Sequence, residues 1–504
     1  MTLNFDIDTN DTDDKTGLVF SKSPWRKYLD KVPARYVLAL LGFFGCCNVS
    51  ALRVNLSVAM VSMINNTAVY GKHASHECGG PSHSNVTKDA PDGEFNWSSD
   101  EQSAIVGAFF YGYVLMQIPG GRLAERFGGK WLVGLGLFCT SVLTMLTPVA
   151  ARWDIRALLV LRVFEGLGEG VVFPALHCML GCWLPKYERS TLTALIYSGT
   201  QIGTVIAMPI SGELCYSDRF GGWPSVFYLF GALGCLWFVF WALFIYEYPD
   251  EHPRITKAEL ILIQTGKDAN RNKALPIPWK SIFKSVPVQA LMITHFGQNW
   301  GFYIFLTELP TYLSSILHFD IEDNGFLSAM PFLMYAIVGW IVSYIADSIR
   351  KKNKYSINTI RKVCNSIGFF GPAICLVGVI LVGCDYVWSV IFLTLAMGFN
   401  GCTCAGYMVT HVDMSPHFAG TLMGMTNGLA TTAGFIGPIV IGRLTHDNET
   451  LTQWRIIFTI AVAVYIVTGL FYVFFASAKS QKWGLNAESD MSVTKKEEKI
   501  NDVD

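Results

Sequence analysis

Four charged side chains lie inside long apolar stretches of the sequence. Arg53 interrupts the run Ala51–Ser57, and Arg162, Glu165 and Glu169 occur together further along the chain. A charged group at the centre of a membrane helix costs roughly 2.5–3.5 kcal/mol on insertion scales, so such groups usually face a water-filled pathway. The spacing of three and then four residues places Arg162, Glu165 and Glu169 on one helical face.

These residue types favour anion binding and proton exchange. A guanidinium donates in a forked geometry that matches carboxylate or phosphate, so Arg53 is the leading anion ligand. Burial favours the neutral form of a carboxyl group, so Glu165 or Glu169 could take up and release a proton during transport. The alternative for Arg162 and Glu165 is an ion pair that only joins two helices, and both interpretations stay open.

An acid and a base also recur at corresponding ends of two apolar runs. Glu125 and Arg126 end the second run, and Asp347 and Arg350 follow the eighth. The recurrence indicates duplicated bundles, which are common in transporter folds. Their position at the same ends of the two bundles makes these four residues candidates for a cytosolic gate.

The histidines give a weaker signal. His411 and Asp413, ahead of Pro416, could belong to the same gate or could simply close a helix before the proline. His177 and His295 lie in apolar runs, where a hydrogen-bonded core histidine is the more common case. The three histidines are too scattered in sequence to indicate an intramembrane enzyme, and we expect no metal site and no cofactor beyond a coupling ion.

Composition determines which elements can hold these residues. Of 504 residues, 51% are hydrophobic and only 15% are charged, whereas a soluble domain carries about a quarter charged residues. Lipid tolerates an apolar exterior, and a membrane helix satisfies its own backbone. The net charge of -1 argues against a nucleic-acid partner. The sequence therefore predicts an all-α polytopic membrane protein surrounded by the lipid bilayer.

Apolar runs of about twenty residues, the length that crosses hydrocarbon, recur about twelve times. The longest polar stretch between them divides the runs into two sets of six. The first set lies near 36–64, 104–118, 131–149, 157–184, 191–214 and 224–246, and the second set lies near 288–312, 326–345, 364–382, 387–409, 420–441 and 456–475. The predicted organisation is a tail at 1–35, a six-helix bundle at 36–247, a linker at 248–286, a second bundle at 287–477 and a tail at 478–504.

The placement of basic residues predicts the orientation. Lysines and arginines precede the first run and follow the second, fourth, sixth and eighth, so the positive-inside rule makes that side cytosolic. The loop at 65–100 falls on the opposite side and carries glycosylation sequons at Asn65, Asn85 and Asn96. Both termini and the linker are therefore predicted to be cytosolic.

Several segments resemble a known superfamily. Gly121–Lys130 is similar to the loop signature of the major facilitator superfamily, with Glu125 where aspartate is usual. More narrowly, four segments in order resemble the anion-transporter family of sialin, the vesicular glutamate transporters and the type I phosphate cotransporters. These segments are Ala51–Ala59, Phe109–Gly121, Arg162–Gly170 and His411–Pro416. The resemblance implies the major facilitator fold, in which two six-helix bundles rock to give alternating access.

The resemblance also implies roles for individual residues. It implies that Arg53 contacts the anionic group of the substrate. It implies that Arg162 binds substrate, that Glu169 takes part in binding or ion coupling, and that Glu165 is a second acid, as in sialin.

One departure from the family's pattern narrows the choice among its branches. Gln298 and Val106 stand where vesicular glutamate transporters carry an arginine and a histidine, which favours the sialin and phosphate-cotransporter branches. The expected function is secondary transport of phosphate or of a carboxylate such as sialate or glutamate, coupled to Na⁺ or H⁺, by a monomer. The expected location is the plasma membrane or an endolysosomal or vesicular membrane. The alternative is a receptor or sensor that binds ligand on the same scaffold without flux.

Overall fold

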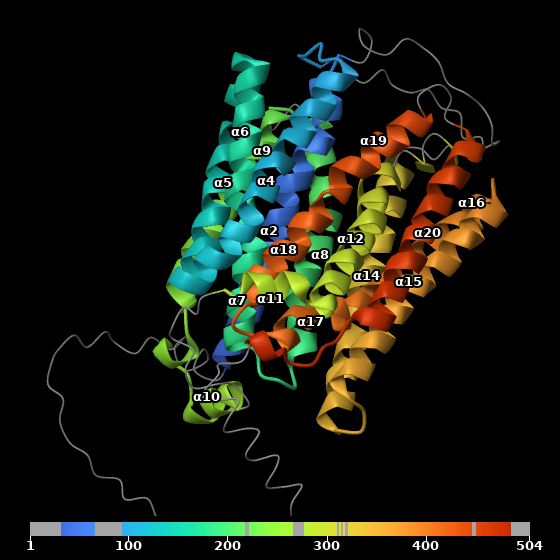
Figure 1. Cartoon of the computed structure of the whole chain (residues 1–504). Helices are drawn as coiled ribbons and strands as arrows, with labels where there is room; N and C mark the ends of the chain where they lie inside the picture. Colours follow the sequence, from blue (N-terminus) through green and yellow to red (C-terminus); the bar gives the residue numbers. More distant parts are fainter. Residues whose placement is uncertain are drawn as a thin grey trace, which may run out of the picture.

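A computed structural model describes residues 32–65, 93–216, 221–265, 277–309, 312–313, 316–317, 321–445 and 450–484. Within these ranges the chain is helical, apart from turns and one isolated β-bridge between Ile64 and Phe95. Figure 1 shows the long helices side by side in two groups, one blue to green and one yellow to red. Each group corresponds to one half of the chain.

The first half packs its helices in three principal pairs. α2 lies against α8, α4 against α6, and α5 against α9. The helices are α2 (Ala34–Met63), α4 (Ser99–Phe127), α5 (Gly129–Trp153), α6 (Ile155–Gly170), α7 (Val172–Trp183), α8 (Arg189–Tyr216) and α9 (Pro224–Phe244). The linker contains η2 (Pro249–Glu251), α10 (Lys257–Gln264) and α11 (Trp279–Lys284).

The second half repeats the same arrangement. Its pairs are α12 with α18, α14 with α16, and α15 with α20, in the same chain order as in the first half. The elements are α12 (Val286–Tyr303), η3 (Ile304–Glu308), α14 (Ile321–Lys351), α15 (Ile357–Val382), α16 (Tyr386–Asn400), η4 (Gly401–Ala405), α17 (Tyr407–Met414), α18 (Ala419–Thr431), α19 (Ala433–Thr445), α20 (Leu451–Phe475) and η5 (Lys482–Gly484). Across the halves, α14 packs on α8 and α18 packs on α4.

Four of the twelve predicted runs contain an interruption that hydropathy did not predict. Run 157–184 divides into α6 and α7, and run 420–441 into α18 and α19. Run 387–409 passes through the 3-10 turn η4, and run 288–312 passes into the π-helical η3. Nine helices in the described ranges are long and apolar enough to cross a membrane, and the segment Tyr386–Met414 is one of them. The predicted runs 157–184, 288–312 and 420–441 are the three of the twelve that are not among these nine. Interrupted helices are typical of transporters, where they border the binding site.

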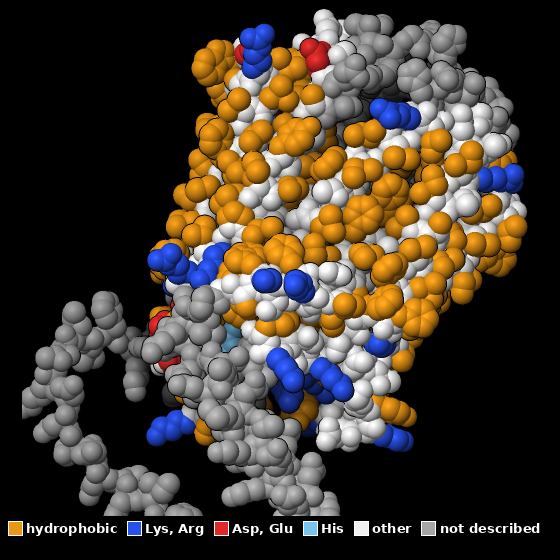
Figure 2. Space-filling view, in the orientation of Figure 1, with side chains coloured by type: hydrophobic (Ala, Val, Ile, Leu, Met, Phe, Trp, Pro, Cys, Tyr) orange, Lys and Arg blue, Asp and Glu red, His pale blue; other side chains and the backbone are white. Residues whose placement is uncertain are grey.

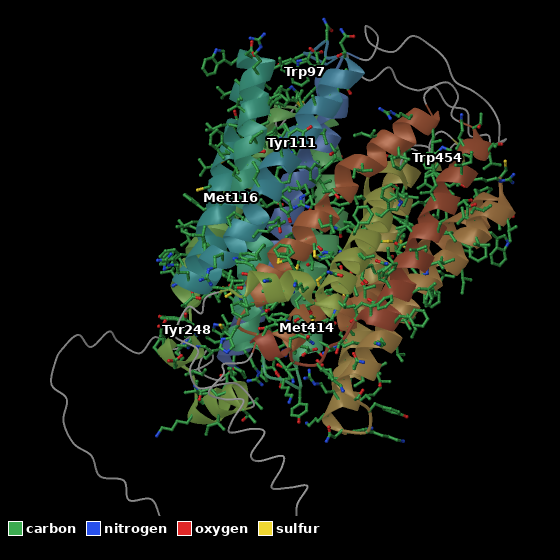
Figure 3. All side chains as sticks on the ribbon, viewed as in Figure 1. Trp97, Tyr111, Met116, Tyr248, Met414 and Trp454 are labelled. Atoms are coloured by element: carbon green, nitrogen blue, oxygen red, sulfur yellow. The ribbon has the colours of Figure 1, made fainter. Side chains whose placement is uncertain are left out.

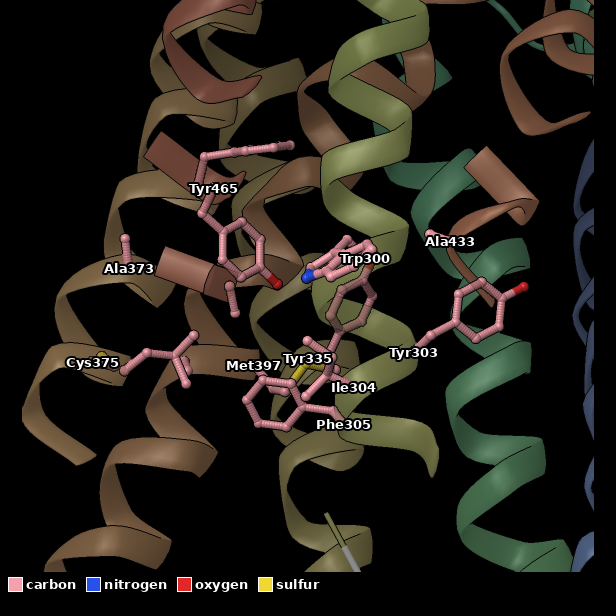
Figure 4. Close-up of a cluster of buried hydrophobic side chains, with 14 of the residues drawn as sticks. Trp300, Tyr303, Ile304, Phe305, Tyr335, Ala373, Cys375, Met397, Ala433 and Tyr465 are labelled. Carbon is pink, nitrogen blue, oxygen red and sulfur yellow. The ribbon is translucent and has the colours of Figure 1, made fainter. Parts of the chain in front are cut away.

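Apolar side chains fill each half and also cover its outside. Figure 4 shows the inner packing of the second half, where Trp300, Tyr335, Met397 and Tyr465 pack together. Figure 2 shows a broad hydrophobic surface, with most of the visible lysine and arginine side chains along and below its lower edge. This distribution is expected for a bundle that is surrounded by lipid.

The linker helix and the predicted gate residues lie at the same end of the bundle. Figure 3 places Trp97 and Trp454 toward one end, and Tyr248 and Met414 toward the other. The linker helix α10 lies at the second end (Figure 1). This is the end at which the predicted gate residues gather.

Candidate functional site

A cavity lies between the two halves. It encloses about 790 Å³, including open solvent at its mouth, and its walls come from α2, α4, α7 and α8 on one side and from α12, η3, α14, α17 and α18 on the other. Among the described residues that line it, Arg53 is the one with a permanent charge. The remaining wall is mostly aromatic or neutral and polar, and it includes Gln298 and Asn427. A pocket between two repeats is where transporters bind their cargo.

Arg53 is paired with Glu169 at the wall of this cavity. Its Nε donates to Glu169 Oε1 over 3.1 Å, and its Nη2 donates to the same oxygen. The Arg53 side chain is 18% exposed, whereas the Glu169 side chain is fully buried. Within the described part of the chain, Glu169 Oε2 has no hydrogen-bond partner. The predicted anion ligand therefore faces the cavity, but with an acid partner that sequence spacing did not reveal.

Glycines allow α6, the helix that carries Glu169, to pack closely on α4. A side chain on Gly112 of α4 would collide with the Val163 carbonyl of α6, and one on Gly166 would collide with the Phe109 carbonyl of α4. Small residues permit such close approach between membrane helices. The close packing of α4 and α6 fixes the position of the helix that carries Glu169.

Arg162 and Glu165 form a second, deeper pair. Arg162 Nη1 donates to Glu165 Oε2, and Thr147 Oγ1 donates to Glu165 Oε1 over 3.1 Å. Both charged residues are buried, and neither lines the cavity. The Phe109 ring lies 5.0 Å from the Arg162 guanidinium and 5.4 Å from that of Arg53. The pair that the sequence left open is therefore present, but it lies within α6 and does not join two helices, so that part of the alternative was wrong. Direct binding of substrate by Arg162 stays a prediction.

Three histidines that are far apart in sequence meet on the gate side of the cavity. The ring of His411 lies 5.4 Å from that of His177 and 6.0 Å from that of His295. Thr426 Oγ1 lies 2.7 Å from His411 Nε2 and 3.0 Å from His295 Nδ1. The histidine cluster was missed because its members come from α7, α12 and α17. Among the described residues, no group of three His, Cys, Asp or Glu side chains could hold a metal ion.

A network of ion pairs joins the halves at the gate end. Asp413 accepts from Arg189 Nη1 over 2.7 Å, from Arg361 Nε over 2.9 Å and from Arg350 Nη1 over 3.4 Å. Arg189 belongs to the first half and the other three residues to the second. All four are buried. Asp413 and Arg350, both named as gate candidates, therefore lie together, whereas Arg189 and Arg361 were missed because their partner Asp413 is 224 and 52 positions away in the sequence.

Two carboxylates of the predicted gate bind helix N-termini across the halves. Asp347 of α14 accepts from the N–H groups of Ser190 (3.2 Å) and Thr191 (2.7 Å), which begin α8. Glu125 of α4 accepts from Thr421 N–H over 2.7 Å and from its hydroxyl over 2.8 Å, in the first turn of α18. A negative charge at a helix N-terminus stabilises unpaired amides and the helix dipole. The two contacts are equivalent in the duplicated halves, and both join one half to the other at this end.

Removing these two charges is expected to open the gate end. Each charge at a helix N-terminus contributes roughly 0.3–1 kcal/mol, and up to about 2 kcal/mol when partly buried. We expect the combined variant E125Q and D347N to label several-fold faster at an introduced T200C, which lines the cavity, when an impermeant thiol reagent is applied from the gate side. D250N, at an exposed acid of the linker, is the matched control. Equal labelling rates in both variants would contradict the gate assignment.

The linker binds the first half by the same kind of contact. Glu259 of α10 accepts from the N–H groups of Ala34 and Arg35, both over 3.1 Å, where α2 begins. Glu247, which directly precedes the linker, accepts from the N–H groups of Gly129 and Lys130 over 2.7 and 2.8 Å, where α5 begins. Burial raises the pKa of Glu247, and these two hydrogen bonds oppose the rise. Because these contacts stay within one half, they can persist while the halves move.

The remaining predicted residues lie outside these networks. Arg126 is exposed, with its guanidinium 5.2 Å from the Phe127 ring, and His411 belongs to the histidine cluster rather than to the ion pairs. Among the sequons, Asn96 is exposed, Asn65 is half-buried, and Asn85 lies outside the described residues. Their glycosylation stays a prediction.

Cys384 is a feature that the sequence reading did not single out. It forms a disulfide, whereas eleven other described cysteines form none. It lies between α15 and α16, at the end opposite the gate. Disulfides persist in oxidising compartments, so this residue carries information about orientation.

Known proteins resemble this chain in sequence and in fold. A family model described as Major Facilitator Superfamily matches residues 38–438. Sialin from Homo sapiens is 42% identical over 457 residues, which cover 90% of this chain and 91% of sialin. A Drosophila ananassae protein named "Putative inorganic phosphate cotransporter" is 40% identical over 456 residues, covering 89% and 94%. Vesicular glutamate transporter 2 from Homo sapiens is 38% identical over 459 residues, covering 90% and 75%.

Solved structures agree on the fold. The proton:xylose symporter XylE, bound to 6-bromo-6-deoxy-D-glucose, superposes with a TM-score of 0.63 at 14% identity, covering 88% of this chain and 97% of XylE. At this identity the likeness concerns the fold alone. The predicted resemblance, its branches and the predicted fold class are confirmed.

Proposed function

The chain belongs to the Major Facilitator Superfamily, and from this premise we propose that it carries small organic anions across a membrane by alternating access. It is a transporter of the anion-carrying kind rather than an enzyme, as its relatives are. The observation that supports the proposal is the position of Arg53, a cation in a cavity between two halves that ion pairs join at the gate end. A receptor would not need such a breakable closure.

The charge of the cavity favours a singly charged cargo. Arg53 supplies one positive charge, and Gln298 stands neutral in the opposite wall. Gln298 is held by Asn400, to which its Nε2 donates over 3.1 Å, and by the Tyr407 hydroxyl, which donates to its Oε1 over 3.2 Å. One guanidinium can match one carboxylate in a bidentate geometry. The hydroxyl and amide groups of the wall suit the polar body of a sugar acid, so we favour a sialate-like monocarboxylate over phosphate.

The same geometry suggests how transport is coupled to protons. Both Arg53 contacts go to one oxygen of Glu169, so an arriving carboxylate can replace this acid on the guanidinium. A buried carboxylate without its cation is costly, so Glu169 would then take up a proton. Release of the cargo would restore the pair and expel the proton. Cargo and proton therefore move together in this scheme.

Flux measurements test the proposal directly. Purified protein in liposomes is expected to accumulate labelled sialate when the side of addition is acidic, and to show weaker uptake of phosphate and glutamate. Sodium gradients at equal pH are expected to have little effect. Saturable binding of sialate without any flux would instead support the receptor alternative.

Glu169→Gln separates coupling from binding. The amide cannot carry a proton, so we expect at least about a tenfold loss of uptake driven by a pH gradient, which corresponds to roughly 1.4 kcal/mol. Exchange of labelled for unlabelled sialate at equal pH is expected to persist, since it requires no net proton movement. E94Q, at an exposed acid paired with Arg152, is the matched control. Loss of exchange and of driven uptake together would assign Glu169 to binding instead.

We also propose an orientation, with both termini and the linker in the cytosol. The gate end carries the basic flanks of the helices, which are typically cytosolic. The Cys384 disulfide and the exposed Asn96 sequon lie at the other end. That end would then face the lumen of an endolysosomal or vesicular compartment, or the cell exterior. The cavity lies within one chain, so we propose that the protein functions as a monomer.

A further inference from the structure

Helix α11 presents two adjacent rows of unlike side chains to the outside. Trp279 and Phe283 form an exposed aromatic row, with ring centroids 6.0 Å apart, and Lys280 and Lys284 form an exposed basic row. Ile282 is the buried residue that anchors the helix. The two rows arise because each pair is spaced by four residues, one turn of a helix. We call these four exposed residues the α11 patch.

The α11 patch lies at the boundary of the apolar surface. Figure 1 shows α11 as a short element on the outside of the longer helices, and Figure 2 shows basic side chains at the lower edge of the hydrophobic surface. Exposed tryptophan and phenylalanine are costly in water but suit the headgroup region of a bilayer. Lysines beside them suit the negative charge of anionic lipids.

The same pattern occurs where α4 ends and α5 begins. Arg126 stands beside exposed Phe127, with its guanidinium 5.2 Å from the ring, and Lys130 stands beside exposed Trp131, with its Nζ 4.7 Å from the ring. In these two pairs, as in the two pairs of the α11 patch, an exposed aromatic residue is the sequence neighbour of a basic one. The repetition at one end of the molecule indicates a common surrounding, which is the membrane interface.

We propose that the α11 patch binds the headgroups of anionic phospholipids in the cytosolic leaflet. The attraction is between the lysine ammonium groups and lipid phosphate or carboxylate, while the two rings insert between the headgroups. The level of the patch at the apolar boundary favours lipid over a soluble acidic protein, which would approach from the water side.

Headgroup binding at α11 would act on the transport cavity through α12. Gln289 of α12 donates its Nε2 to the Phe283 carbonyl of α11 over 2.8 Å, and the two helices adjoin at Ser285. α12 carries His295, Gln298 and Tyr303 into the cavity wall. A lipid that fixes α11 therefore fixes the end of a helix that lines the binding site.

Lipid retention gives a test that is independent of transport. Native mass spectrometry would compare phosphatidylserine bound to the purified wild type, to the double variant K280Q and K284Q, and to the control K351Q and K352Q at the exposed α14–α15 turn. Each lysine near an anionic surface contributes a factor of about five, so we expect roughly 30-fold weaker retention in the α11 variant at low salt. The control is expected to match wild type.

A second measurement tests whether lipid binding at α11 affects transport. Uptake into phosphatidylcholine liposomes is expected to rise several-fold when phosphatidylserine is included for wild type and control, and to stay unchanged for K280Q and K284Q. Equal phosphatidylserine retention by all three proteins would overturn the proposal. A change from dimer to monomer in the α11 variant would also overturn it, in favour of a second copy of the chain as the partner. Retention does not depend on the proposed function, so the two can fail separately.

Discussion

Replacing Arg53 with alanine is expected to abolish anion uptake, with a loss of at least about 100-fold. A hydrogen bond to a charged group contributes roughly 1.5–3 kcal/mol, and a bidentate pair uses two such bonds. The variant also leaves Glu169 buried without its cation, which costs about 3–5 kcal/mol when one partner of a buried pair is removed. We therefore expect a lower unfolding temperature together with the loss of uptake, measured in liposomes and by thermal unfolding in detergent.

Companion variants separate binding from stability. R53K keeps the charge but loses the forked geometry, so it is expected to recover stability more than uptake. The double variant R53A and E169Q removes both charges and is expected to regain thermal stability while remaining inactive. R152Q, at an exposed pair with Glu94, is the control and should retain uptake. If R53A transports like wild type, the anion site lies elsewhere.

Asp413→Asn is expected to have the largest effect on stability. Asp413 is the carboxylate that Arg189, Arg350 and Arg361 share in a buried position. Its loss leaves three guanidiniums in mutual repulsion, and removal of one partner from a buried pair alone costs about 3–5 kcal/mol. We expect poor yield and a markedly lower unfolding temperature. The surviving protein is expected to favour the conformation open at the gate end, because Arg189 is no longer tied to the other half.

The control for this variant is D385N. Asp385 is exposed and accepts hydrogen bonds from the N–H groups of Val387 and Trp388 at the start of α16, far from the gate. Asparagine caps a helix about as well as aspartate, so little change in stability is expected. A D413N protein as stable as D385N would show that the gate network does not hold the halves together.

Much of the fold was predictable because hydropathy is a local property. Runs of about twenty apolar residues predicted the helices, and the matching positions of Glu125 and Asp347 predicted the duplication. The predicted gate carboxylates bind equivalent helix N-termini in the two halves. The charged groups of the cavity region, Arg53 and Glu169, were also identifiable, since charges are conspicuous within apolar runs.

The helix interruptions were not predictable from apolarity. The break at Val171 has no hydropathy signal of its own, because the residues 170–176 around it are all apolar or glycine. The same holds at Thr432, between α18 and α19. Continuous apolarity is compatible with one helix or two, and packing against neighbouring helices decides between them.

The sequence by itself determined the membrane class, the approximate helices and the charged side chains that must avoid lipid. The tertiary structure decided which of these side chains meet. Arg53 pairs with Glu169 across 116 positions, and Arg189 pairs with Asp413 across 224. The histidine cluster likewise forms only when α7, α12 and α17 converge. The physical reason is that burial is dictated by each segment's own composition, whereas a partner's identity depends on how closely separate helices can approach.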